Sequence, residues 1–206
     1  QLKTPFSRQY LLERPRVEFA DRAAFAESLP PKRDIGVMAA HDFATLATLT
    51  AGVFNGEGPN TLTNSDSTVL AVARLTIHPF QPVDIGANIA TYGSDSTRYG
   101  ADAGMSSGPV SGRAEFIDQH HAGAPNEQDD FGWYVEGMYH ASPHVQLLLR
   151  QEDLRRPAAQ PRDIATTAGA AIETSDHHVR ATLEVISRAL AGVRHGEALG
   201  QLQLTF

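Results

Sequence analysis

The chain has 206 residues, which is enough for one domain with a sizeable core or for the wall of one β-barrel. It contains no cysteine, which excludes disulfides and thiolate metal sites, and its net charge of −7 argues against a general nucleic-acid-binding protein. Uninterrupted apolar runs are only a few residues long, so no transmembrane helix is predicted. A membrane barrel remains compatible with this composition, because its strands are apolar on one face only.

The amino-terminal part of the chain differs from the rest. A strand is predicted at 1–6, followed by a long segment, 7–32, that is partly helical. Residues 18–28 favour a helix that ends before Pro30, with apolar side chains along one stripe. A connection of this length could fold into a barrel lumen and narrow it, or could be an ordinary surface excursion.

Strict alternation of apolar and polar residues dominates the remaining sequence and predicts strands. The odd-numbered positions of residues 69–77 are apolar, whereas Arg74 and Thr76 lie on the opposite face, and residues 83–89 and 179–185 repeat the pattern. About twelve strands are predicted in all, at 1–6, 33–41, 44–54, 67–78, 83–93, 98–106, 110–119, 131–141, 144–152, 163–174, 177–190 and 196–206.

The connections between these strands are sorted by length. One side carries the polar segments 7–32, 55–66, 120–130 and 153–162 with the shorter loops 94–97 and 191–195; the other carries tight turns near 41–42, 78–82, 107–109, 142–143 and 175–176. In an up-and-down barrel every second connection falls on the same side, as in outer-membrane barrels with short periplasmic turns and longer external loops. The prediction is therefore an all-β, antiparallel up-and-down transmembrane β-barrel that forms a single domain over residues 1–206.

Four short tracts and the terminal residue resemble a known family. The tracts are residues 1–7 (QLKTPFS), 16–22 (RVEFADR), 31–37 (PKRDIGV) and 52–56 (GVFNG), and Phe206 is the closing aromatic residue. In this order they resemble the phosphate-selective porin O and P family of outer-membrane porins. The resemblance covers roughly the first 60 residues and, more weakly, the last ten.

The resemblance implies a water-filled channel of the bacterial cell outer membrane whose inward-folded loop and wall arginines select anions such as phosphate. Members of that family are about twice as long as this chain and resemble sixteen-stranded trimeric pores. The resemblance therefore implies that this chain is either a shortened relative of about twelve strands or a portion of a longer barrel. The implied partners are the lipid bilayer, small solutes or anions, and two further copies in a homotrimer, with no nucleic acid.

Guanidinium groups suit phosphate because they stay charged and present forked donors. The resemblance and the polar strand faces together give the candidate ligand- or anion-binding residues. They are Arg14, Arg16, Arg22, Lys32 and Arg33 in the long segment, and Arg74, Arg113, Arg150, Arg180 and Arg188 on the wall. The acids Glu115, Glu136, Glu152 and Glu184 share the wall faces, so the alternative is that these charges pair across neighbouring strands.

Other chemistry finds little support in the sequence. His120 and His121 are neighbours on a predicted strand and point to opposite faces, so neither a metal site nor a cofactor is predicted. Glu136 and Glu152 could imitate a glycosidase carboxylate pair, but no second catalytic motif accompanies them.

The sequence thus predicts a porin that is not an enzyme and that allows small solutes to diffuse passively, with a possible preference for phosphate or other anions. The alternative is a soluble β-barrel or sandwich module that binds a small ligand in its mouth. A third class, an enzyme built on an outer-membrane barrel, would need a catalytic constellation that the sequence does not contain.

Overall fold

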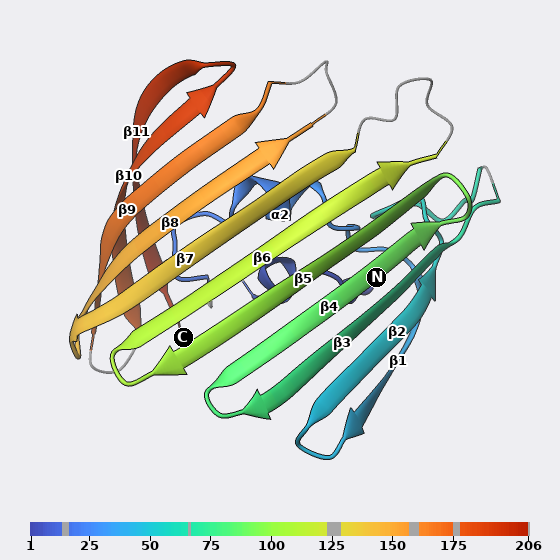
Figure 1. Ribbon diagram of the computed structural model, residues 1–206, viewed down its shortest axis with the longest axis horizontal. Helices are drawn as coiled ribbons and strands as arrows, with labels where there is room; N and C mark the ends of the chain where they lie inside the picture. The colour runs from blue at the N-terminus through green and yellow to red at the C-terminus, as the bar shows by residue number, and fades with distance from the viewer. Residues whose placement is uncertain (14–16, 66, 123–128, 157–160, 175–177, 206) are drawn as a thin grey trace.

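The computed structural model describes residues 1–13, 17–65, 67–122, 129–156, 161–174 and 178–205. It contains one eleven-stranded sheet in which every neighbouring pair is antiparallel and the strands follow one another in chain order (Figure 1). The predicted all-β, antiparallel up-and-down arrangement is therefore confirmed. The strands are β1 Gly36–Phe43, β2 Ala47–Phe54, β3 Leu70–Phe80, β4 Val83–Tyr92, β5 Ser96–Ser107, β6 Val110–His121, β7 Asp130–Ser142, β8 Val145–Arg155, β9 Asp163–Glu173, β10 Val179–Leu190 and β11 Val193–Leu204.

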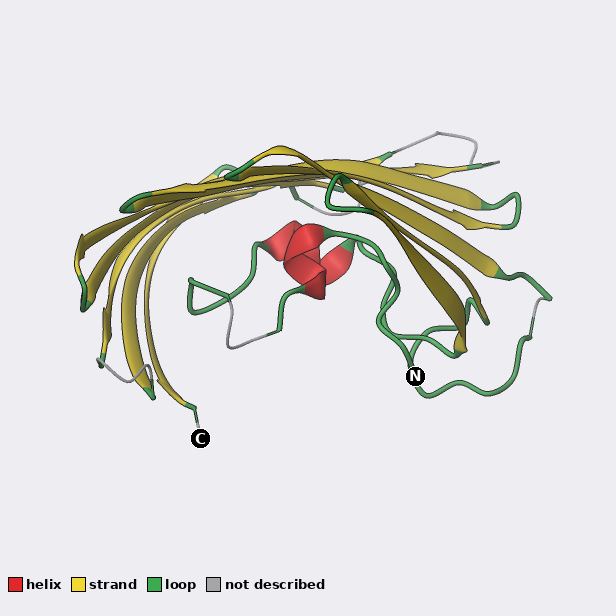
Figure 2. Cartoon of the chain, turned by 90° about the horizontal axis from the view of Figure 1, so that it is seen from below, coloured by secondary structure: helices red, strands yellow, loops and turns green. Residues whose placement is uncertain are grey.

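The sheet is an open arch. Figure 2 shows that it curves around the amino-terminal segment, residues 1–35, whose described residues lie on its concave side and include the short helices α1 (Arg8–Leu11) and α2 (Ala24–Ser28). Among the described residues, β1 and β11 are the two ends of the sheet and do not pair with each other. Neither helix is long and apolar enough to cross a membrane.

Alternation along the strands separates the two faces of the arch. The predicted apolar files lie on the convex face, where Leu149 is 57% and Leu183 is 65% exposed. Their neighbours along the chain, Arg150 and Glu184, point to the concave face and are only 3% and 1% exposed. Because successive strand residues alternate, this one pattern produces an apolar outer surface and a polar inner one.

Residues 1–6 do not form the predicted strand. Leu2 makes a single antiparallel bridge with Asp34, after which Thr4 Oγ1 donates to the Pro31 carbonyl at 2.7 Å and Phe6 is fully buried. Pro5 has no N–H to offer a ladder, so the tract turns into the arch instead. The other eleven predicted strands each overlap an observed one.

The predicted helix at 18–28 is also shorter than expected. Only Ala24–Ser28 is helical, because the backbone before it bonds to the wall: Ala20 N–H donates to Glu184 and the Asp21 carbonyl accepts from Arg150. Tertiary hydrogen bonds here replace those that a longer helix would have made. The helix α1 was not predicted.

Tight turns occur where they were predicted at 81–82, 108–109 and 143–144, whereas the turn predicted at 41–42 lies at 44–46 because β1 continues to Phe43. The turn predicted at 175–176 lies outside the described residues. The long connections 55–69, 122–129 and 156–162 all lie at the opposite end of the strands. The predicted loop 191–195 is different, since β10 and β11 are joined by 191–192 alone, both with positive φ. Gly192 accepts this conformation without strain, so a two-residue hairpin turn is possible there.

The core lies between the amino-terminal segment and the concave face. Phe6, Ala23, Phe25 and Leu29 from the segment pack with wall residues that include Tyr134. A second, smaller cluster joins Phe19 to Met138, Leu148 and Ala171. The amino-terminal segment therefore fills the concave side of the arch with its buried side chains.

Replacing Phe25 with alanine tests this core. Phe25 is 1% exposed, and its ring centroid lies 5.6 Å from that of Tyr134. We expect Phe25→Ala to lower the free energy of unfolding by about 3–5 kcal/mol, measured by denaturant titration with Trp133 fluorescence. The control Leu62→Ala removes a side chain that is 87% exposed, and should change it by less than about 0.5 kcal/mol. Equal effects of the two substitutions would contradict a core at this position.

Candidate functional site: the concave face

The concave wall makes room for the amino-terminal segment through small residues. Gly132 of β7 faces Phe25, and a Cβ at this position would lie 2.4 Å from the Phe25 Cβ atom. Gly104 of β5 is similar, because a Cβ there would lie 2.8 Å from the Arg8 guanidinium. Glycine at these two positions allows the segment to approach the wall closely.

Three wall glutamates accept hydrogen bonds from the backbone of the segment. Glu115 receives the N–H groups of Arg8 at 3.0 Å and Gln9 at 3.1 Å, one on each carboxylate oxygen. Glu152 receives the Ala24 N–H at 3.3 Å, and Glu184 receives the N–H of residue 20 at 2.7 Å.

Two of these glutamates act as caps for the helices. Arg8 and Gln9 open α1 and Ala24 opens α2, so Glu115 and Glu152 bind N–H groups that have no partner within their helix. The N-cap residue of α2, Ala23, supplies no side-chain hydrogen bond of its own. A carboxylate at a helix N-terminus also complements the local positive charge of the backbone. The wall thus adds to the cap that Ser7 gives α1 and supplies the side-chain cap that α2 lacks.

The wall arginines bind the carbonyl groups of the same segment. Arg150 donates to the Asp21 carbonyl at 2.8 Å, and its guanidinium lies 4.5 Å from the centre of the Phe19 ring. Arg180 donates to the Glu18 carbonyl at 3.0 Å and to the Gln146 side chain at 2.7 Å. Donors and acceptors of the wall are therefore matched to a backbone that has little regular hydrogen bonding of its own.

A charged network fixes Arg8 at the β3–β5 side of the arch. Its guanidinium bonds to Asp102 at 2.7 Å and to Asp84, while Arg74 forms a two-pronged pair with Asp102 at 2.6 and 2.9 Å and also donates to Asn88. Burial by itself would lower the pKa of Arg8, but the two aspartates outweigh burial and raise it. The sequence prediction had included Arg74 but not Arg8, Asp84 or Asp102. The polar file of the predicted strand at 83–93 contained Asp84, which was the available signal.

A cavity of about 370 Å³ opens next to this network. Arg8, Glu13, Arg74 and Asp84 line it together with two leucines. Two cationic and two anionic side chains thus face one space, which gives it mixed charge.

The other predicted wall arginines also have anionic or carbonyl partners. Arg113 lies 3.4 Å from Glu136 and 3.6 Å from Glu18, and Arg188 lies 2.6 Å from Asp163. All five wall arginines point to the concave side, where Arg113 and Arg180 share Glu18 at 3.6 and 3.3 Å and the other three have separate partners. This arrangement is the alternative of charge pairing that the sequence had left open.

The predicted cations of the segment fall into different environments. Arg22 donates to the carbonyls of Gln9 at 3.0 Å and Leu12 at 2.7 Å and to Glu27 at 2.9 Å. Lys32 donates to the Glu27 carbonyl, and burial lowers its pKa. Arg33 is exposed. Arg14 and Arg16, like Phe206, lie outside the described residues.

The histidines of β6 separate as the alternation predicted. His121 faces the inner side and contacts Gln119 and Asp130, whereas His120 is on the outer face. There, the ligand atoms of Asp118, His120 and Asp129 all lie within 4.8 Å of one another, a grouping that the sequence did not suggest. It was missed because Asp129 lies beside His120 only once β6 and β7 pair.

Comparison with known proteins adds no identification: neither the models of protein families nor the curated proteins contain a match to this chain.

Adding one methyl group to the wall tests how the segment is seated. Gly132→Ala would force its new Cβ against Phe25, so we expect the segment to dock less firmly, at a cost of about 1–3 kcal/mol. Trypsin should then cleave the segment faster at Arg22 or Lys32. The matched control is Gly137→Ala in the same strand, because a Cβ there has no atom within 4 Å. Equal cleavage rates in both variants would show that the segment does not contact Gly132.

Proposed function

We propose that this chain forms wall strands of a porin-type channel of the bacterial outer membrane, through which small solutes diffuse passively. The observation that carries the proposal is the distribution of polarity across the arch. Charged side chains are buried on the concave face, whereas the large apolar side chains of the strands are exposed on the convex face. The exposed convex residues include Val53, Ile85, Ile89, Phe116, Val135, Leu147, Leu149, Ile172, Leu183, Val185 and Leu202.

A continuous apolar surface of this kind suits lipid better than water, because water-soluble monomers rarely expose large apolar patches. Shallow hollows on the same face are lined by apolar residues, one of about 580 Å³ near Val53 and Ile89 and another of about 400 Å³ near Phe116 and Val135. Acyl chains match such hollows in both polarity and shape.

Strand length is consistent with a bilayer. The strands β3 to β11 have between 10 residues, as in β4, and 13 residues, as in β7. An 11-residue strand such as β3, at ~3.3 Å per residue and a tilt of roughly 45°, rises about 26 Å. That distance is close to the height of the apolar band of outer-membrane barrels, ~25 Å.

A barrel also places a condition on strand number. Because all neighbouring strands are antiparallel and eleven is odd, β1 and β11 run in the same direction. A closed antiparallel barrel therefore requires an odd number of strands besides these eleven, and lipid would penalise edges left unpaired. The sixteen strands implied by the family resemblance satisfy this condition.

In the proposed channel the amino-terminal segment narrows the lumen. It fills the concave side and leaves mixed charge at the Arg8–Arg74 cavity, so passage would be governed by size and by weak discrimination between ions. Phosphate preference rests on the resemblance alone, since the described wall arginines already have partners. Assembly as a homotrimer is likewise part of the proposal through the resemblance, and no covalent step or cofactor is required.

Single-channel recording tests passage directly. We expect the purified protein, with its barrel completed by the further strands that closure requires, to produce discrete conductance steps in a planar bilayer in potassium chloride. We expect added phosphate to block these steps only weakly. Strong block at low phosphate concentration would instead establish an anion site. Protein that stays soluble without detergent and never inserts would favour the soluble ligand-binding module.

Introducing a charged side chain on the convex face tests whether lipid or water surrounds that face. Leu149 lies near the middle of β8 and is 57% exposed. In a bilayer, Leu149→Lys should lower the free energy of unfolding by about 2–4 kcal/mol, measured by denaturant titration in liposomes. In a water-soluble protein the same change should stay within about 0.5 kcal/mol. Leu62→Lys, in the connection between β2 and β3, is the control and should be neutral in either case.

A further inference from the structure

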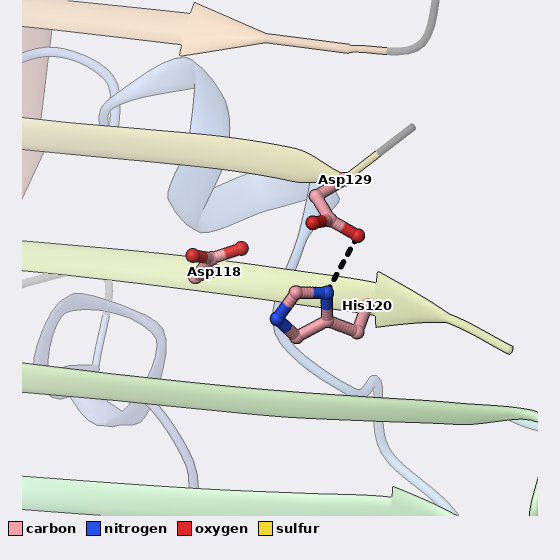
Figure 3. Close-up of side chains that lie close together, drawn as sticks. All are labelled: Asp118, His120 and Asp129. Carbon is pink, nitrogen blue, oxygen red and sulfur yellow. Dashed lines mark ion pairs between the residues drawn. The ribbon is translucent and has the colours of Figure 1, made fainter. Parts of the chain in front are cut away.

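We propose that Asp118, His120 and Asp129 form a binding site for a divalent transition metal ion such as Zn²⁺ on the outer face of the sheet. Figure 3 shows Asp118 and His120 on one strand and Asp129 beside the imidazole ring. The proposal needs only the pairing of β5, β6 and β7 and does not depend on the channel.

The strand register brings the three side chains together. Asp118 and His120 are two residues apart in β6 and therefore share a face. Gln119 is opposite Asp130, so Asp129 falls next to His120, and Tyr99 of β5 is opposite Asp118 on the other side. The ligand atoms of the aspartates and the histidine lie within 4.8 Å of one another.

Hydrogen bonds already orient the imidazole. Its Nδ1 atom lies 2.7 Å from Asp129 and its Nε2 atom lies 2.8 Å from the Tyr99 hydroxyl, which in turn lies 3.3 Å from Asp118. An ion shared by all three side chains would bind a single imidazole nitrogen and would replace the hydrogen-bond partner that this nitrogen now has. At Nε2 the Tyr99 hydroxyl would give way to the ion, and the Asp129 carboxylate would leave Nδ1 to ligate the same ion.

A second observation concerns the Asp118 carboxylate. Its Oδ1 atom is buried and has no hydrogen-bond partner in the described part of the chain. A buried carboxylate oxygen without a partner is unfavourable, and a bound cation would satisfy it.

The charge balance also differs from that of the concave face. Inside the arch, aspartates such as Asp102 are paired with arginines. Among the described residues, no lysine or arginine forms an ion pair with Asp118, and the ion pair of Asp129 is with His120. Two carboxylates thus lie close together without a fixed cation.

The donor set selects the class of ion. One imidazole nitrogen with two carboxylates suits Zn²⁺ and its neighbours in the transition series, whereas Ca²⁺ and Mg²⁺ prefer oxygen ligands alone. Ligand atoms that share a Zn²⁺ ion at ~2.0–2.2 Å must approach more closely than 4.8 Å. The side chains of His120 and Asp129 are 52% and 35% exposed, so they are free to make this adjustment and are accessible to an ion.

Isothermal titration of the folded protein with zinc chloride at neutral pH tests the site. We expect one Zn²⁺ ion to bind per chain, with Ca²⁺ binding at least about tenfold more weakly, and His120→Gln to weaken Zn²⁺ binding by about tenfold or more. Asp118→Asn and Asp129→Asn should each weaken it as well. Saturating Zn²⁺ should raise the unfolding temperature of the unaltered protein but not that of His120→Gln.

The matched control is His121→Gln, which removes the adjacent imidazole on the opposite face and should leave Zn²⁺ affinity unchanged. Three results would overturn the proposal: no Zn²⁺ binding to the unaltered protein at millimolar concentration, equal affinity in His120→Gln, or loss of affinity only in His121→Gln. Binding to the unaltered protein is measured without any substitution, so a variant that fails to fold does not remove the test.

Discussion

The arrangement of this protein depends on one constraint: a backbone buried against a sheet must find partners for its N–H and carbonyl groups. The described part of the amino-terminal segment has only two short helices, so it cannot satisfy these groups by itself. Wall glutamates accept its N–H groups and wall arginines donate to its carbonyls. Many charges of the concave face are therefore occupied in holding the segment, whereas others, such as Arg74 and Arg188, pair with acids of the wall itself.

That matching has a consequence for the proposed channel. A lumen whose cations are already bonded to carboxylates and carbonyls has little free positive charge with which to select an anion. Arg8 and Arg74 show the effect, since both bind Asp102 beside a cavity of mixed charge. Size would then discriminate between solutes more than charge does, because the segment occupies space in the arch while the wall charges largely cancel.

The outer face follows a different rule. It is apolar along the middle of the strands, and polar groups appear on it at the ends, as with Asp118, His120 and Asp129 beside the connection 122–129. A β-sheet can display such different chemistry on its two faces because neighbouring residues point in opposite directions. His120 and His121 are the shortest example: one joins the outer cluster and the other bonds inward to Gln119 and Asp130.

Period-two alternation in the sequence determined the strands and the face that each residue occupies, and the alternation of long and short connections indicated their antiparallel order, because these properties are local and repeat along the chain. It also indicated that Arg74 and Arg150 point inward. What it did not determine were the contacts between distant segments. Residues 1–6 alternate like a strand yet leave the sheet, the helix at 24–28 is shortened by bonds to Glu184 and Arg150, and Arg8 meets Asp84 and Asp102 from far along the chain. Only the tertiary structure decided these features, because each depends on contacts between residues that are far apart in the chain.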